Sequence, residues 1–330
     1  MPESLVLLII VILVAIGFGV ANGFNDAANA IATVIGTRTL SPRQAIVMAA
    51  FFNFAGAATG TAVALTIGKG IVSPEFLTLP TIIAGSGAIV IWAVIATRAG
   101  MPISLTHGLV SGMVGAGIAM SGTVSIVWNV LIKVISAVGI APLLGFLAGF
   151  IVMVAIYWIF KDALPSRVSK IFGKLQIASA AFMAYSHGKN DGQMPIGVIS
   201  MALMVFYGWS DMKILPWVIV LSAASISFGT AVGGWRVIRT LGLRMTTMRP
   251  VHGFAASASA AGIIELASHF GIPVSTTHCM SSAIMGVGAT KRLSAVRWGI
   301  AKDIVLTWVL TFPVCGVLGW ILASLLKLIF

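Results

Sequence analysis

Two Asn-Asp pairs interrupt long apolar stretches of this sequence. They are Asn25 with Asp26, in the stretch 5–35, and Asn190 with Asp191, in the stretch 177–206. If such stretches lie in a bilayer, an ionised carboxylate costs about 2.5 to 3.5 kcal/mol on insertion scales, so each Asp is a candidate for a functional site. Their oxygens can coordinate a cation, and a carboxylate can instead take up a proton. The pairs therefore predict a site that couples to Na+ or H+, with Asp26 and Asp191 as candidate Na+ ligands.

The two pairs have similar surroundings, since each lies near a glycine and inside apolar sequence. This favours helices that are broken at the pairs, where freed backbone carbonyls join the side chains as ligands. The alternative is that each Asp lies at a helix end in the membrane interface, where its charge costs little.

Two segments rich in hydroxyl groups are the second chemical feature. They read Pro-Ile-Ser-Leu-Thr-His over residues 102–107 and Pro-Val-Ser-Thr-Thr-His over residues 273–278. Proline suits the first turn of a helix, and the free N–H groups of a helix N-terminus attract anions. We expect an oxyanion pocket where the two segments meet, with the hydroxyl groups of Ser104, Thr106, Ser275, Thr276 and Thr277. The alternative is that these hydroxyls only bond back to carbonyls of their own helices.

Three further polar residues are candidates to orient these ligands. His107 and His278 end the hydroxyl segments, and Glu265 lies eight residues before Pro273 in a short apolar stretch. Polar groups on helices near a polar cavity can position their neighbours without touching the substrate.

The two kinds of motif occur twice, in the same order. Asp26 precedes Pro102 by 76 residues, and Asp191 precedes Pro273 by 82 residues. Glycines follow 13 and 15 residues after each proline. A duplication changes what each motif means, because one site can then be built from both copies. We divide the chain into a first copy (residues 1–160), a basic linker (161–174) and a second copy (175–330).

Composition determines the solvent of this chain. Of 330 residues, 59% are hydrophobic and 8% are charged, and the mean hydropathy is +1.07, too apolar for a water-soluble core. The net charge of +12 lies in short loops between apolar stretches, which is typical of cytoplasmic loops and not of nucleic-acid binding. Two cysteines in apolar sequence give no disulfide framework. We expect an all-α polytopic protein surrounded by membrane lipid.

The loop charges predict how the copies are oriented. The linker 161–174 is basic and is therefore expected in the cytoplasm. The loop with Arg38 and Arg43 is basic, whereas its counterpart in the second copy carries Asp211 with Lys213. Corresponding loops thus differ in charge, so the copies face opposite ways, with five crossings each, about ten in all, and both termini outside. Inverted repeats with broken or re-entrant helices are typical of secondary transporters.

The paired motifs resemble those of the inorganic phosphate transporter (PiT) family, and in particular bacterial phosphate permeases. Residues 23–30 match its signature through Asn29, whereas the second copy departs after Asp191, with Gln193 where the signature continues. The resemblance covers nearly the whole chain. It implies a phosphate symporter of roughly twelve helical elements, a homodimer, and supporting roles for Asn29 and Gln193.

We therefore expect a secondary active symporter in the plasma membrane that moves inorganic phosphate with Na+ or H+ by alternating access, without a bound cofactor. Nothing resembles a nucleotide-binding loop or a nucleophile with its base, so an enzyme is not expected. The alternatives are a proton-coupled sulfate permease and a passive anion channel, although a passive pore gains nothing from buried acids.

Overall fold

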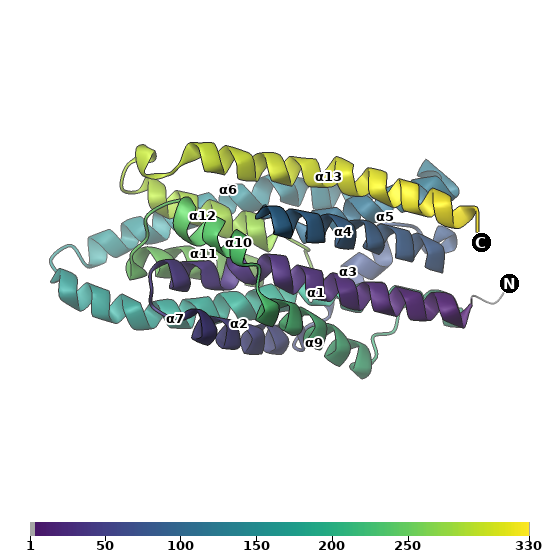
Figure 1. The fold of residues 1–330 in the computed structure, drawn as a ribbon, viewed down its shortest axis with the longest axis horizontal. Helices are drawn as coiled ribbons and strands as arrows, with labels where there is room; N and C mark the ends of the chain where they lie inside the picture. Colours follow the sequence, from purple (N-terminus) through teal and green to yellow (C-terminus); the bar gives the residue numbers. More distant parts are fainter. Residues whose placement is uncertain (1–3, 330) are drawn as a thin grey trace.

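The computed structural model describes residues 4–329. These residues form helices joined by turns and loops, and no β-strand occurs among them (Figure 1). The helices are α1 (Leu5–Gly36), α2 (Pro42–Ala57), α3 (Ala62–Gly70), α4 (Leu79–Ala99), α5 (Leu105–Ser121), α6 (Trp128–Ile159), α7 (Pro165–Asp191), α8 (Gln193–Tyr207), α9 (Pro216–Val232), α10 (Trp235–Arg239), α11 (Pro250–His269), α12 (Thr276–Ala289) and α13 (Trp298–Lys327). A π-helical segment, Thr240–Arg244, follows α10. The all-α fold class is confirmed. Residues 161–174, expected as a linker, form a turn and the first part of α7.

Four of these helices, α1, α4, α6 and α13, are long and apolar enough to cross a membrane. Two bent pairs are further candidates: α2 meets α3 at 69°, and α9 meets the segment 235–244 at 62°. The described residues therefore hold four to six candidate spans, fewer than the ten crossings expected.

Two pairs of consecutive helices form hairpins. Gly85 of α4 lies against Met113 of α5, and Gly108 lies against Ile89, so α4 and α5 run antiparallel. Helices α11 and α12 also follow one another and pack together. Figure 1 shows α4 and α5 in the half of the molecule nearer the start of α1, and α11 and α12 in the opposite half.

The tips of the two hairpins are held in the same way. Gly100 ends α4 with φ of 77°, and Gly271 follows α11 with φ of 66°, a left-handed conformation that favours glycine. The carbonyl of Gly100 accepts a hydrogen bond from Thr240 at 3.1 Å, and that of Gly271 accepts one from Thr66 at 2.7 Å. Each tip is thus tied to the bent segment of the other half of the chain.

The two halves of the chain also interlock through glycines. A Cβ on Gly23 would lie 2.0 Å from the carbonyl oxygen of Ile226 in α9, and one on Gly188 would lie 2.1 Å from that of Asn53 in α2. Helix α5 packs on α13 and α12 packs on α6 by similar contacts, as at Gly115. The glycines after the hydroxyl segments therefore serve close helix packing.

Helix α1 passes through Asn25 and Asp26 without interruption, so the predicted break at the first pair is wrong. At the second pair the helix is interrupted: α7 ends at Asp191, α8 begins at Gln193, and Gly192 between them keeps helical angles (φ −64°, ψ −20°). At the first pair, neighbouring side chains bond to the polar groups, so no break is needed there. Larger bends lie at the two bent pairs.

The polar residues of α1 separate two apolar clusters. Residues 7–21 of α1 pack with α3, α4, α5 and α8, whereas residues 27–34 pack with α7, α11 and α12. Asn25 and Asp26 lie between the clusters and are buried. The fold therefore places these polar side chains where the two apolar cores meet.

Candidate functional site

The carboxylates of Asp26 and Asp191 come together at one hydroxyl group. Thr276, the first residue of α12, lies with its Oγ1 3.2 Å from Oδ2 of Asp26 and 3.2 Å from Oδ2 of Asp191. Both carboxylates are at most 2% exposed. Residues 165 positions apart in sequence thus share a single donor, so the two Asn-Asp pairs belong to one site.

Thr277 and Asn29 complete the surroundings of Asp26. The Thr277 hydroxyl donates to Oδ1 of Asp26 at 3.0 Å. Asn29, one helical turn after Asp26 on α1, donates from Nδ2 to Thr277 at 3.0 Å and to Thr276 at 3.4 Å. Because its amide donates to both hydroxyls, their protons are directed towards the carboxylates.

His187, which stands just before the second Asn-Asp pair in the sequence, also belongs to this site. Its Nε2 lies 3.4 Å from Asp191 Oδ2 and 3.8 Å from Asp26 Oδ2. On α7 it precedes Asp191 by four residues, so it shares that residue's helix face. Single ligand atoms of the three residues lie within 4.8 Å of one another, which is close enough to hold one cation.

The proton position on His187 follows from its other nitrogen. Nδ1 lies 2.7 Å from Oδ1 of Asn53, and the Asn53 amide nitrogen donates to Thr230 at 2.8 Å. The Asn53 oxygen is therefore the acceptor, and Nδ1 carries the proton in the neutral ring. Nε2, which faces the carboxylates without a hydrogen-bond partner among the described residues, can then take a cation or a second proton.

Asn25 and Asn190 hold the segments before the short helices. Asn25 donates to the Met101 carbonyl at 3.3 Å and accepts from the Ile103 amide at 3.4 Å. Asn190 donates to the Val274 carbonyl at 2.7 Å and to its neighbour Asp191 at 2.8 Å. Each amide therefore positions the extended segment that leads into the hydroxyl-rich helix of its own half.

Two hydroxyls missed in the sequence orient these amides. Thr97 accepts from Asn25 at 2.7 Å, and Ser268 donates to Asn190 at 3.2 Å. Both stand five residues before the proline of their segment, Pro102 or Pro273, and this equal offset was visible in the sequence.

The hydroxyl segments begin α5 and α12, but later than expected. Ser104 and Ser275 are the N-caps and accept from the N–H groups of His107 at 3.3 Å and His278 at 3.2 Å. The prolines therefore precede the helices instead of opening them, because serine caps better than the residues around it. The N–H groups of the first two residues of each helix have no acceptor within that helix.

The two N-termini face one another. Thr106 Oγ1 donates to the Val274 carbonyl at 3.2 Å, and the rings of His107 and His278 lie 4.8 Å apart between centroids. The hydroxyls of Ser104, Thr106, Ser275, Thr276 and Thr277 are all buried. The arrangement offers N–H and O–H donors from two helices beside a pair of carboxylates, and can hold an anion together with a cation.

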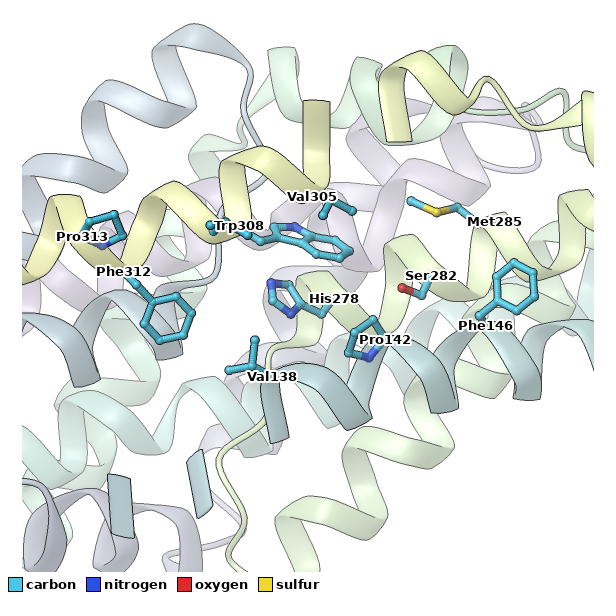
Figure 2. Close-up of a pocket in the computed structure, with 11 residues that line it drawn as sticks. Val138, Pro142, Phe146, His278, Ser282, Met285, Val305, Trp308, Phe312 and Pro313 are labelled. Carbon is cyan, nitrogen blue, oxygen red and sulfur yellow. The ribbon is translucent and has the colours of Figure 1, made fainter. Parts of the chain in front are cut away.

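The rings of the two histidines pack against aromatic side chains of α13. His278 packs against Trp308 at 3.9 Å between ring centroids, and His107 stacks on Phe312 at 4.9 Å. His278 lines a cavity of about 600 Å³ whose other lining residues are almost all apolar, Pro142 among them (Figure 2). An oxyanion finds few donors there, so this cavity is not the substrate site.

Gln193 and Glu265 are not brought to the carboxylates. The Gln193 side chain accepts from the backbone amides of Val63 at 2.8 Å and Ala64 at 3.1 Å, and so caps α3. Glu265 forms an ion pair with Lys189 and is partly exposed. Both tie α7 and α8 to their neighbours.

Comparison with known proteins gives consistent results. A model described as the phosphate transporter family matches residues 22–319. A Bacillus subtilis (strain 168) protein described as a probable low-affinity inorganic phosphate transporter is 40% identical, over 100% of both chains. A Rhizobium meliloti (strain 1021) protein with the same description is 40% identical, over 95% of this chain and 94% of its own. A solved structure, "The sodium-dependent phosphate transporter", matches with a TM-score of 0.89 and 26% identity, over 99% of this chain and 100% of that one.

Proposed function

Since this chain belongs to the phosphate transporter family, we propose that it is a symporter of inorganic phosphate and a cation. It is a multi-pass membrane transporter and not an enzyme. The observation that carries the proposal is the sharing of the Thr276 hydroxyl between Asp26 and Asp191. Two carboxylates so close together repel one another, and a cation between them removes the repulsion.

The coupling cation, Na+ or H+, occupies the space between Asp26, Asp191 and His187. Sodium would take carboxylate oxygens as ligands, and a proton would sit on His187 Nε2 or on a carboxylate. The solved relative is described as sodium-dependent, which favours sodium. His187 Nε2 offers a nitrogen lone pair that can take up a proton beside the carboxylates, which favours a proton.

Phosphate binds at the facing N-termini of α5 and α12. Backbone N–H groups there, with the hydroxyls of Ser104, Thr106, Ser275, Thr276 and Thr277, supply donors for its oxygens. Thr276 and Thr277 also touch the carboxylates, so the bound cation and the bound anion stabilise one another. This explains why phosphate would move only with its cation.

Alternating access follows from the two hairpins. Their tips meet at the site, and each is bonded to the bent segment of the other half, through Thr240 or Thr66. A change in one bend would therefore move the hairpin tip beside it and open one side while the other closes.

The chain lies in the plasma membrane as a homodimer with both termini outside. The start of α1 and the end of α13 lie at one end of the molecule, and the basic α6–α7 connection lies at the other (Figure 1). Basic loops favour the cytoplasmic side.

Uptake of labelled phosphate into proteoliposomes tests this function. With an inward gradient of Na+ or of H+, phosphate accumulates above its equilibrium level, and excess unlabelled phosphate competes whereas sulfate does not. Passive equilibration without either gradient would identify an anion channel instead. Competition by sulfate at equal concentration would identify a sulfate permease.

A further inference from the structure

A second cavity, of about 730 Å³, lies at the end of the molecule that carries the α6–α7 connection. It is bounded by the end of α6, the start of α7, the start of α11 and the residue Lys291 that follows α12. Its charged lining residues are all cationic: Lys161, Arg249 and Lys291.

Two of these three cations have no ion-pair partner among the described residues. Among residues 4–329, neither Arg249 nor Lys291 forms an ion pair, and Lys161 lies 4.0 Å from the exposed carboxylate of Asp162. Burial and the nearby Arg249 lower the pKa of Lys291. Lys291 donates to the Thr247 carbonyl at 3.0 Å, which leaves two of its three protons for another acceptor.

Tyr157 offers a further donor to the cavity. His252 Nδ1 accepts from the backbone amide of Arg249 at 2.9 Å, so in the neutral ring the proton is on Nε2. Nε2 lies 3.4 Å from the Tyr157 oxygen and donates to it. The Tyr157 hydroxyl hydrogen is then free to be donated to a ligand.

The remaining wall is apolar and leads into the lipid-facing surface of α6. Phe160, Val168 and Val251 line the cavity, and next to it Trp158 and Ile159 are each 73% exposed. Trp and Tyr at a helix end are typical of the headgroup level of a membrane. A free anion would not use this apolar wall, whereas a phospholipid presents a phosphate group and acyl chains together.

We propose that this cavity binds the headgroup of an anionic phospholipid, with its phosphate between Arg249, Lys291 and the Tyr157 hydroxyl. The acyl chains lie along the end of α6. The site is separate from the transport site and does not depend on which ion drives transport.

Native mass spectrometry of the full-length protein in detergent, titrated with short-chain phosphatidylglycerol, tests the proposal. The double variant Arg249→Ala/Lys291→Ala is compared with Arg167→Ala/Lys170→Ala, which removes the same charge from α7 outside the cavity. We expect the cavity variant to bind phosphatidylglycerol about 10-fold more weakly and the control to bind it as the wild type does. Tyr157→Phe is a milder third variant that keeps the ring, and we expect about 3-fold weaker binding.

Equal loss in both double variants would overturn the proposal, since binding would then follow net charge alone. Wild-type binding in the cavity variant would overturn it too, as would displacement of the lipid by millimolar inorganic phosphate, which would indicate a free-anion site. Phosphate uptake is recorded in parallel, so that a failure of the proposed transport function is recognised separately from a failure of lipid binding.

Discussion

The carboxylates of Asp26 and Asp191 accept from one and the same hydroxyl group, at 3.2 Å each. The donor is Thr276, which also opens α12, one of the two helices that face each other at the site. One side chain thus connects both halves of the chain, the acidic pair and the proposed anion site. The predictions below follow from this arrangement.

Thr276→Val removes the shared donor and keeps the shape of the side chain. Both carboxylates lose a partner, so we expect cation-dependent phosphate uptake to fall about 10-fold or more, as for a lost hydrogen bond to a charged group. Thr276→Ser keeps the hydroxyl and should retain most of the uptake. Similar rates for the valine and serine variants would show that the hydroxyl does not matter. Uptake into proteoliposomes is the measurement, after thermal unfolding in detergent has confirmed folding.

Asn53→Leu leaves the Nδ1 proton of His187 without its acceptor. The ring can then turn, or its proton can move from Nδ1 to Nε2. In either case Nε2 no longer presents its lone pair to a cation between the carboxylates. We expect the apparent affinity for the coupling cation to fall about 10-fold, as for other residues that orient a ligand, while the maximal rate changes less. The affinity is read from uptake rates against Na+ concentration at several pH values.

A matched control is Thr59→Val, which removes a hydroxyl near the end of α2 that contacts Tyr185 outside the site. It should leave the cation affinity unchanged. If Asn53→Leu behaved like this control, His187 would have no part in cation binding.

Gly23→Ala and Gly188→Ala test the close crossings that place the two Asn-Asp pairs. A Cβ at either position meets a backbone carbonyl oxygen near 2 Å, which cannot move out of the way. We expect each variant to lose about 1–3 kcal/mol of stability, seen as a lower unfolding temperature in detergent. Gly139→Ala, where nothing lies within 4 Å, is the control and should unfold like the wild type. Unchanged unfolding of both site variants would mean that the helices shift apart easily.

The sequence predicted that the Asn-Asp pairs and the hydroxyl segments meet, but not that Gln193 and Glu265 lie elsewhere or that α1 is continuous. The Asn-Asp pairs and hydroxyl segments were recognisable because polar residues stand out in apolar sequence. The continuity of α1 was not, because an unbroken helix can keep Asp26 buried only when Thr276, Thr277 and His187 surround it, and all three come from distant sequence.

The turns of the two hairpins were not predicted for a related reason. Hydropathy measures how much of a segment is apolar and says nothing about its direction, so it does not show that α4 packs on α5 or α11 on α12. The glycines at which the chain turns, Gly100 and Gly271, require a left-handed conformation that hydropathy does not report.

The central claim is that one cation site is built from both halves of the chain, and phosphate binding by single carboxylate variants tests it most directly. Binding of labelled phosphate to the purified protein is measured with and without Na+ over a range of pH, for Asp26→Asn, Asp191→Asn and the surface control Asp162→Asn. Removing one member of a buried charged set costs about 3–5 kcal/mol. We therefore predict that each site variant alone loses cation-dependent phosphate binding by about 100-fold or more, whereas the control binds normally. Wild-type, cation-dependent phosphate binding by either single variant, confirmed as folded, would contradict the account.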